Sequence, residues 1–203
     1  MRLSFLHLLL AVILFSSFSH EPLSDWKVSK TEDEIEISYR RILVGDTLET
    51  REMRVTFEIQ ATPDALVAMF RDKDKFMSWS PDVSACTVLA EEGSEWVMHK
   101  TYDLPWPIST RDIVTRQSVE ETDAKTTLDI TGEEGWVEPV EGVKRIPQYE
   151  AHWNFYPVSG EMTEVVYTTV ELSSRPGPRF VVDGIVEGSY IKSIKRLKEK
   201  MHG

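Results

Sequence analysis

The sequence contains a single cysteine, Cys86, among its 203 residues. One thiol cannot supply an internal disulfide, a four-thiolate zinc site or an iron–sulfur cluster, so the fold has to rest on its apolar core. Basic residues are also scarce, because 23 Lys and Arg stand against 34 Asp and Glu and give a formal net charge of −11. Such a charge repels the phosphates of nucleic acids, and we expect no nucleic-acid partner.

Motifs for catalysis and for cofactor binding are equally scarce. The sequence has no Gly-x-Ser-x-Gly elbow, no Gly-rich phosphate loop and no Cys-x-x-Cys or His-x-x-x-His spacing. Only His99 and His152 lie within the expected fold, where the residues that share their strand faces indicate exposed or edge positions. We expect neither a metal nor a cofactor. A Ser–His–Asp arrangement stays open, because a triad can assemble from distant positions.

The N-terminus has the pattern of a secretory signal peptide. Arg2 supplies a positive charge, residues 3–18 are largely apolar, and serines occupy the −3 and −1 positions of a cleavage site after Ser19. An uncleaved anchor would need about 20 apolar residues to span a bilayer, and this run is shorter. We expect residues 1–19 to be cleaved and residues 20–203 to form one domain in the periplasm or outside the cell, with membrane association left open.

Strands are predicted wherever apolar and polar residues alternate between turn signals. The clearest run extends from Glu52 to Ile59, whose odd-numbered residues are apolar and whose even-numbered residues are polar. Such alternation is typical of a strand with one buried face. Turn-like segments between the runs favour a continuous antiparallel meander. The predicted strands cover residues 35–43, 52–59, 83–91, 94–102, 111–121, 124–131, 149–156 and 162–172.

Two helices are expected beside these strands. Thr62 as N-cap and Pro63 at the first helical position predict a helix over residues 62–71, followed by an irregular turn through Trp79. Apolar residues recur at helical spacing over 181–201 and predict a closing helix. The segment from Gly132 to Pro147 is expected to be an irregular but ordered surface loop.

Gly184 and Gly188 lie one turn apart on the closing helix. Each glycine costs about 1 kcal/mol relative to alanine in a helix interior. Close packing against the sheet would explain both glycines. The alternative is a locally weakened helix that can lift from a cavity.

Four motifs occur along the chain in a characteristic order. They are Trp79-Ser80-Pro81, Leu104-Pro105-Trp106-Pro107 with Arg111-Asp112, Trp153-Asn154-Phe155-Tyr156-Pro157, and Gly177-Pro178-Arg179-Phe180-Val181-Val182-Asp183. In this order and spacing they resemble the motifs of START (steroidogenic acute regulatory protein-related lipid transfer) domains. The resemblance extends from about Trp26 to Met201 and implies an α+β helix-grip fold, in which a curved antiparallel β-sheet wraps around a long C-terminal α-helix. It also implies one apolar tunnel that shields a single lipid, whereas alternation alone favours a solid core.

Arg111 shares a strand face with apolar residues, so a buried guanidinium there must be paired or hydrogen-bonded. The resemblance implies that Arg111 lines the tunnel and pairs with an acid or holds the polar head of a ligand. The acid of sterol-binding relatives would fall near Ala85, which carries no carboxylate, so sterol specificity is in doubt. Arg111 could instead meet an anionic lipid head, or form a structural salt bridge with Asp112 or another acid. The ligand-binding candidates are Arg111, Trp96, Met98, Tyr102, Ile113, Trp153, Phe155, Tyr167, Phe180, Val181 and Ile185.

Two functions follow from the resemblance. The first is a carrier that binds one hydrophobic ligand, such as a sterol or a phospholipid, and moves it between membranes or through the periplasm as a monomer with transient membrane contact. The alternative is a helix-grip enzyme of the cyclase or hydrolase type that acts on a hydrophobic small molecule. The basic residues of the closing helix could face anionic lipids, although such a stripe is usually a solvated helix face. They are Lys192, Lys195, Arg196, Lys198 and Lys200.

Overall fold

The structure is a computed structural model that describes residues 20–45, 47–172 and 178–202. The predicted signal peptide and Gly177 of the last motif lie outside the described residues. The strands are β1 (His20–Pro22), β2 (Lys27–Glu32), β3 (Ile35–Val44), β4 (Leu48–Gln60), β5 (Val83–Glu92), β6 (Glu95–Tyr102), β7 (Arg111–Glu121), β8 (Thr126–Gly132), β9 (Lys144–Arg145), β10 (Tyr149–Ser159) and β11 (Met162–Glu171). The helices are α1 (Pro63–Arg71), α2 (Lys73–Trp79) and α3 (Arg179–His202).

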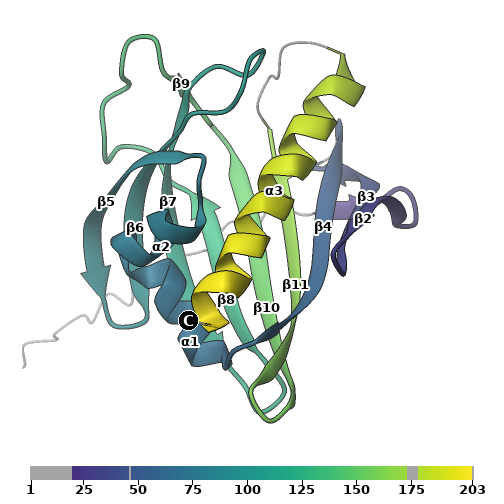
Figure 1. The fold of residues 1–203 in the computed structure, drawn as a ribbon. Helices are drawn as coiled ribbons and strands as arrows, with labels where there is room; N and C mark the ends of the chain where they lie inside the picture. Colours follow the sequence, from purple (N-terminus) through teal and green to yellow (C-terminus); the bar gives the residue numbers. More distant parts are fainter. Residues whose placement is uncertain (1–19, 46, 173–177, 203) are drawn as a thin grey trace, which may run out of the picture.

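One curved sheet holds these strands in the order β1-β3-β4-β11-β10-β8-β7-β6-β5, and all neighbours in this order are antiparallel. In Figure 1 the sheet wraps around α3, as the helix-grip expectation requires. The predicted meander is correct from β5 to β11 but not throughout, because β4 pairs with β11 and the chain then crosses through α1 and α2 to the far edge. Strand β2 pairs with β3, and β9 pairs with β7 in parallel inside the predicted irregular loop.

The first helix begins as the sequence predicts. The Thr62 side chain accepts a hydrogen bond from the backbone N–H of Ala65 at 3.3 Å, and Pro63 occupies the first turn. The predicted irregular turn after it is wrong, because α2 occupies that segment. Asp72 caps this second helix by accepting hydrogen bonds from the amides of Asp74 and Lys75 at 2.8 and 3.0 Å.

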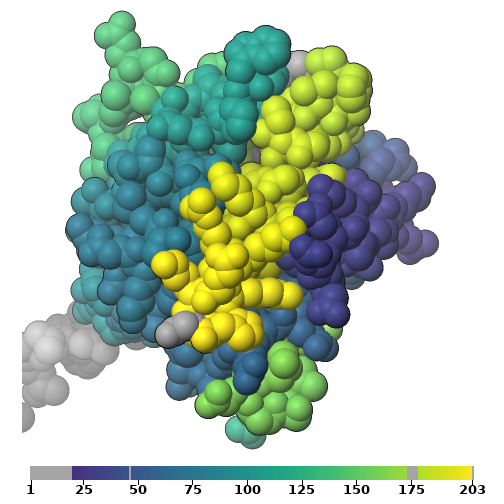
Figure 2. Space-filling view, viewed as in Figure 1, coloured from purple at the N-terminus to yellow at the C-terminus, as the bar shows by residue number. Residues whose placement is uncertain are grey.

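The apolar core lies between the concave face of the sheet and the three helices. Aromatic rings from α1, α2 and β10 meet there, with ring centroids 5.1 Å apart for Phe70 and Trp79 and 4.8 Å apart for Phe70 and Trp153. Helix α3 buries one side against this core. The apolar residues on that side are Val182, Val186, Ile191, Ile194 and Leu197. Its other side stays exposed and crosses the molecule in Figure 2 between the N-terminal strands and the α1–β7 region. No helix in the described part of the chain has the length and apolar character needed to cross a membrane.

The two glycines of α3 do not serve close packing. A Cβ atom added at Gly184 or at Gly188 would meet no other atom within 4 Å. The packing explanation is therefore wrong, and both positions weaken the helix without a steric reason.

Candidate functional site

A cavity of about 140 Å³ lies between the concave face of the sheet and the middle of α3. All three helices contribute to its wall, together with strands β6, β7, β8, β10 and β11. The α2–β5 and β6–β7 loops and Ile146, which follows β9, complete it. Most of the lining side chains are aromatic or aliphatic, and four charged residues interrupt them: Asp82, Lys100, Arg111 and Glu171. An apolar wall with a few placed polar groups is typical of a site for a hydrophobic small molecule.

The structure places five of the eleven candidate residues in the cavity wall, namely Tyr102, Arg111, Ile113, Trp153 and Tyr167. The other six lie elsewhere. Trp96, Met98 and Phe155 are on the predicted faces of their strands but are buried in the solid core beyond the cavity. Val181 and Ile185 are half-buried on α3 outside the cavity, and Phe180 is 79% exposed.

Arg111 pairs across the cavity wall with Glu171, the last residue of β11. The guanidinium Nη1 lies 3.6 Å from the Glu171 carboxylate, and Arg111 is 3% exposed. The structural salt bridge with another acid, which the sequence left open, is therefore present. Sequence reasoning missed Glu171 because strands β7 and β11 are far apart in the chain and are separated in the sheet by β8 and β10.

Asp112 faces away from Arg111 and fixes the loop between β8 and β10. Arg145 donates two hydrogen bonds of 2.8 Å to the Asp112 carboxylate, and the Nε2 atom of His99 lies 2.9 Å from it. Burial raises the pKa of Asp112, but the hydrogen bonds from Arg145 and His99 together outweigh burial and leave the pKa below its ordinary value. This part-buried network, together with the parallel pairing of β9 with β7, anchors the loop beside the start of β7.

Three tyrosine hydroxyls form a chain across the cavity. The hydroxyl oxygens of Tyr149 and Tyr167 are 3.1 Å apart, and those of Tyr167 and Tyr190 are 2.8 Å apart. Burial is the main cause that raises the pKa of Tyr149 and of Tyr167, so both hydroxyls stay protonated at neutral pH. The chain links β10 and β11 to α3 and adds neutral hydrogen-bonding groups to the cavity.

Lys100 is a charged residue of the wall that the sequence analysis did not single out. It is 3% exposed, and its Nζ atom lies 5.0 Å from the centre of the Phe76 ring. Burial lowers the pKa of Lys100 from 10.5 to about 8. A signal was present in the sequence, because Lys100 interrupts the apolar face that Met98 and Tyr102 share on the same strand.

A second, polar pocket of about 370 Å³ adjoins the cavity under the N-terminal half of α3. It shares Glu171, Val186 and Tyr190 with the first cavity, so the two spaces meet at these side chains. On its far side Arg51 donates a hydrogen bond of 2.6 Å to Asp183 of α3. We refer to this second pocket as the vestibule.

Polar contacts hold α3 over the cavity from both sides. On one side Ser189 donates a hydrogen bond to Asp82, in the loop after α2, and the Lys192 ammonium lies 3.8 Å from the same carboxylate. On the other side Ser29 of β2 donates a hydrogen bond of 2.7 Å to Glu187. The Lys192–Asp82 pair is partly exposed to solvent, and such an ion pair contributes about 0–1 kcal/mol. The two serine hydrogen bonds are part-buried.

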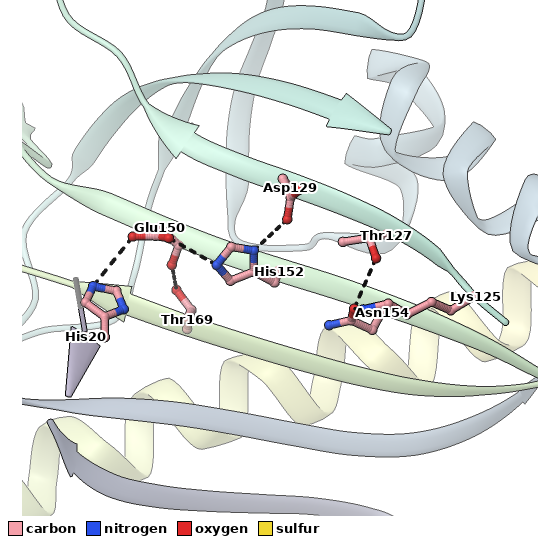
Figure 3. Close-up of polar contacts among 8 residues, drawn as sticks. All are labelled: His20, Lys125, Thr127, Asp129, Glu150, His152, Asn154 and Thr169. Carbon is pink, nitrogen blue, oxygen red and sulfur yellow. Dashed lines mark hydrogen bonds and ion pairs between the residues drawn. The ribbon is translucent and has the colours of Figure 1, made fainter. Parts of the chain in front are cut away.

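The outer face of the sheet carries a separate polar cluster, shown in Figure 3. His152 of β10 lies between two carboxylates, with Nδ1 2.5 Å from Asp129 and Nε2 3.1 Å from Glu150, and His20 of β1 approaches Glu150 within 3.5 Å. The hydrogen bonds to Asp129 and Glu150 raise the pKa of His152 from 6.5 to about 9. The side chain is 38% exposed, as the sequence suggested. Within the described ranges no group of three or more His, Cys, Asp or Glu side chains has an arrangement that could hold a metal ion.

Comparison with known proteins agrees with this architecture. The family described as polyketide cyclase / dehydrase and lipid transport matches residues 50–202. A STAR-related lipid transfer protein from Xanthomonas axonopodis is 23% identical, with a TM-score of 0.75 over 88% of this chain and 99% of that chain. Human StAR-related lipid transfer protein 5 is 17% identical, with a TM-score of 0.74 over 87% of this chain and 86% of that chain. An uncharacterized protein of Pseudomonas aeruginosa is 23% identical over 193 residues, which are 93% of each chain. The chain therefore belongs to the polyketide cyclase / dehydrase and lipid transport family and has the helix-grip fold of START domains.

Proposed function

We propose that the protein binds one lipid in the cavity under α3 and carries it between membranes or through the periplasm. The observation that supports this proposal is the apolar cavity that α3 closes. Burial of an acyl chain there would contribute about 25 cal/mol for each Å² of apolar surface removed from water. Such binding needs few polar contacts and no catalytic group.

The size of the cavity indicates that α3 must shift when a lipid binds. A dry cavity of about 150 Å³ is large enough for a benzene molecule, and the cavity here is about 140 Å³. The adjoining vestibule supplies further space if the side chains between the two pockets, such as Val186 and Tyr190, move apart. Both residues lie on α3, so a small displacement of this helix would join the two spaces.

Transient membrane contact would occur at the end of the molecule where α3 begins. Trp106, in the loop between β6 and β7, is 89% exposed, and Phe180 at the start of α3 is 79% exposed. The β6–β7 loop and the start of α3 lie at the same end of the fold in Figure 1. Aromatic side chains favour the interface between membrane and water. The basic stripe is less suited to this role, because its Lys195 pairs with Glu32 and Asp33.

We propose that residues 1–19 direct the protein to the periplasm or the outside of the cell and are then removed, and that the carrier acts as a monomer. This location follows from the sequence pattern of those residues. An N-terminal cleavage site after Ser19 would leave His20 as the first residue of the mature chain. Mass measurement of the protein purified from its own cells tests the cleavage directly.

An enzyme of the cyclase type is the second candidate, since the cavity also holds Arg111 and buried tyrosine hydroxyls. These groups could orient and polarise a carbonyl-rich substrate. Turnover of a polyketide or ester substrate that disappears in Arg111→Ala or Tyr167→Phe, while the fold persists, would favour the enzyme. Its absence, together with lipid uptake, favours the carrier.

A matched pair of cavity variants tests the carrier. Thr115 is fully buried in the cavity wall, whereas Thr131, on the neighbouring strand β8, is exposed on the outer face. We expect Thr115→Phe to fill the cavity and to reduce the binding of fluorescent fatty acid, phospholipid and sterol probes at least tenfold. Thr131→Phe should bind like the wild-type protein. Equal binding by both folded variants, or no uptake of any probe by the wild-type protein, would contradict the proposal.

A further inference from the structure

Lys100 differs from the other charged residues of the cavity wall because no acid pairs with its ammonium group among the residues that the structure describes. It shares the concave face of β6 with Tyr102, and both residues line the cavity. Its Nζ atom lies over the face of the Phe76 ring, 5.0 Å from the ring centre. Phe76 itself lines the cavity, so the ammonium group lies beside the space that a ligand would occupy.

The acids nearest to the cavity are committed to other partners. Asp82 accepts the hydrogen bond from Ser189 and lies 3.8 Å from Lys192. Glu171 pairs with Arg111. Neither carboxylate is therefore placed to neutralise Lys100.

The residue that faces Lys100 from β5 does not neutralise it either. Cys86 is the register partner of Lys100 in the β5–β6 pair. Burial raises the pKa of the Cys86 thiol, so this group is uncharged at neutral pH. From β7 the register partner is Ile113, which is apolar.

A buried ammonium group without a counter-ion is unfavourable in an apolar surrounding. Burial lowers the pKa of Lys100 to about 8, so most molecules still carry the charge at pH 7. A ligand that brings an anion into the cavity would gain a charge-assisted hydrogen bond and would remove this cost. A neutral ligand of the same length would gain neither.

We propose that the bound lipid is a single-chain amphiphile whose carboxylate head pairs with Lys100 inside the cavity. This inference rests on the proposed carrier function and names the chemistry of its ligand. A carboxylate fits better than a phosphate head, because the cavity is small and the ammonium group of Lys100 balances a single negative charge. The apolar chain would lie against the aromatic and aliphatic side chains of the cavity wall.

The test compares dodecanoate with dodecan-1-ol, which has the same chain without the charge. Titration calorimetry at pH 7 would measure both affinities for the wild-type protein, for Lys100→Met and for Lys100→Gln. Lys27→Met, at an exposed lysine of β2, is the matched control. We expect the wild-type protein and Lys27→Met to bind dodecanoate at least tenfold more tightly than the alcohol. Both Lys100 variants should lose this preference while they keep the affinity for the alcohol.

Each other result identifies what is wrong. Equal affinity of the wild-type protein for the acid and the alcohol would overturn the role of Lys100 and leave the carrier function intact. Equal loss of both ligands in the two folded Lys100 variants would show a structural role for the lysine. Tighter binding of dodecyl phosphate than of dodecanoate would overturn the choice of a carboxylate. Failure of every compound to bind would overturn the carrier function itself.

Discussion

Replacement of Gly184 and Gly188 by alanine should stabilise α3 and slow the exchange of a bound lipid. Both glycines lie in the half of α3 that covers the vestibule and the edge of the cavity. If a ligand leaves when this half of the helix loosens, a stiffer helix must delay its departure. The equilibrium affinity should change much less than the rate, because the closed helix makes the same contacts in both proteins.

The expected size of the effect follows from helix propensity. A Cβ atom at either position would meet no other atom within 4 Å, so no steric cost opposes the gain. Glycine costs about 1 kcal/mol relative to alanine at each position, and the double variant should gain about 2 kcal/mol. If opening requires these turns to unwind, exchange should slow roughly 30-fold, since 1.4 kcal/mol corresponds to a factor of 10 in rate.

The assay is stopped-flow transfer of a fluorescent lipid from the loaded protein to vesicles. Urea unfolding of the same samples would measure the gain in stability. Glu199→Ala, an exposed substitution near the far end of α3, is the control and should leave the rate unchanged. A double variant that is more stable by about 2 kcal/mol and yet exchanges its ligand at the wild-type rate would refute the gate.

Three further predictions concern stability. Burial lowers the pKa of Lys100 to about 8, so the folded protein loses this proton at a lower pH than the unfolded chain does. The stability of the wild-type protein relative to Lys100→Met should therefore rise by up to about 3 kcal/mol between pH 8 and 10.5. Hydrogen bonds led by the one with Asp129 raise the pKa of His152 to about 9. His152→Gln should therefore be less stable than the wild-type protein below pH 6.5 and equally stable above pH 9. The loss at low pH should be about 1 kcal/mol, because the contact of His152 with Asp129 is partly exposed to solvent. Trp79→Ala should cost about 3–5 kcal/mol, whereas Trp106→Ala, which removes an exposed ring, should change stability by less than about 0.5 kcal/mol.

Urea titrations at several pH values measure all three effects. A stability difference between the wild-type protein and Lys100→Met that stays constant from pH 7 to pH 10 would contradict the burial of a charged ammonium group. A loss of stability in His152→Gln that occurs only at high pH would contradict the raised pKa of His152. Similar losses for the two tryptophan variants would contradict the assignment of Trp79 to the core.

Local patterns in the sequence predict most of the fold. Alternation places the strands from β3 to β8 together with β10 and β11, and the spacing of apolar residues places α3. It does not place the two-residue strand β9. Helix α2 escaped prediction because a single residue, Asp72, both ends α1 and caps α2. The pairing of β4 with β11 could not be predicted, because no local pattern encodes a contact between strands so far apart in the chain.

The sequence predicts which face of each strand points toward the core, but not which residues on that face line the cavity. Alternation identifies the concave face of each strand, so the predicted ligand-binding residues include Trp96 and Phe155, which lie in the core, together with Tyr102, which lines the cavity. It does not show where along a strand the helix and the sheet move apart to leave a cavity. Phe180 was expected to line the cavity from the closing helix, yet its side chain at the start of α3 is exposed. The pairing of Glu171 with Arg111 could be predicted only from the order of the strands in the sheet. The only signal for Lys100 was its position as a polar residue on an apolar strand face.

Native mass spectrometry of the protein, purified without detergent from its own cells, tests the carrier function most directly. Solvent extraction of the same sample would release and identify the bound molecule. We predict one lipid for each chain, lost in the Thr115→Phe variant and retained in Thr131→Phe. A wild-type protein that carries no lipid, and that takes up none from vesicles, would contradict the proposed function.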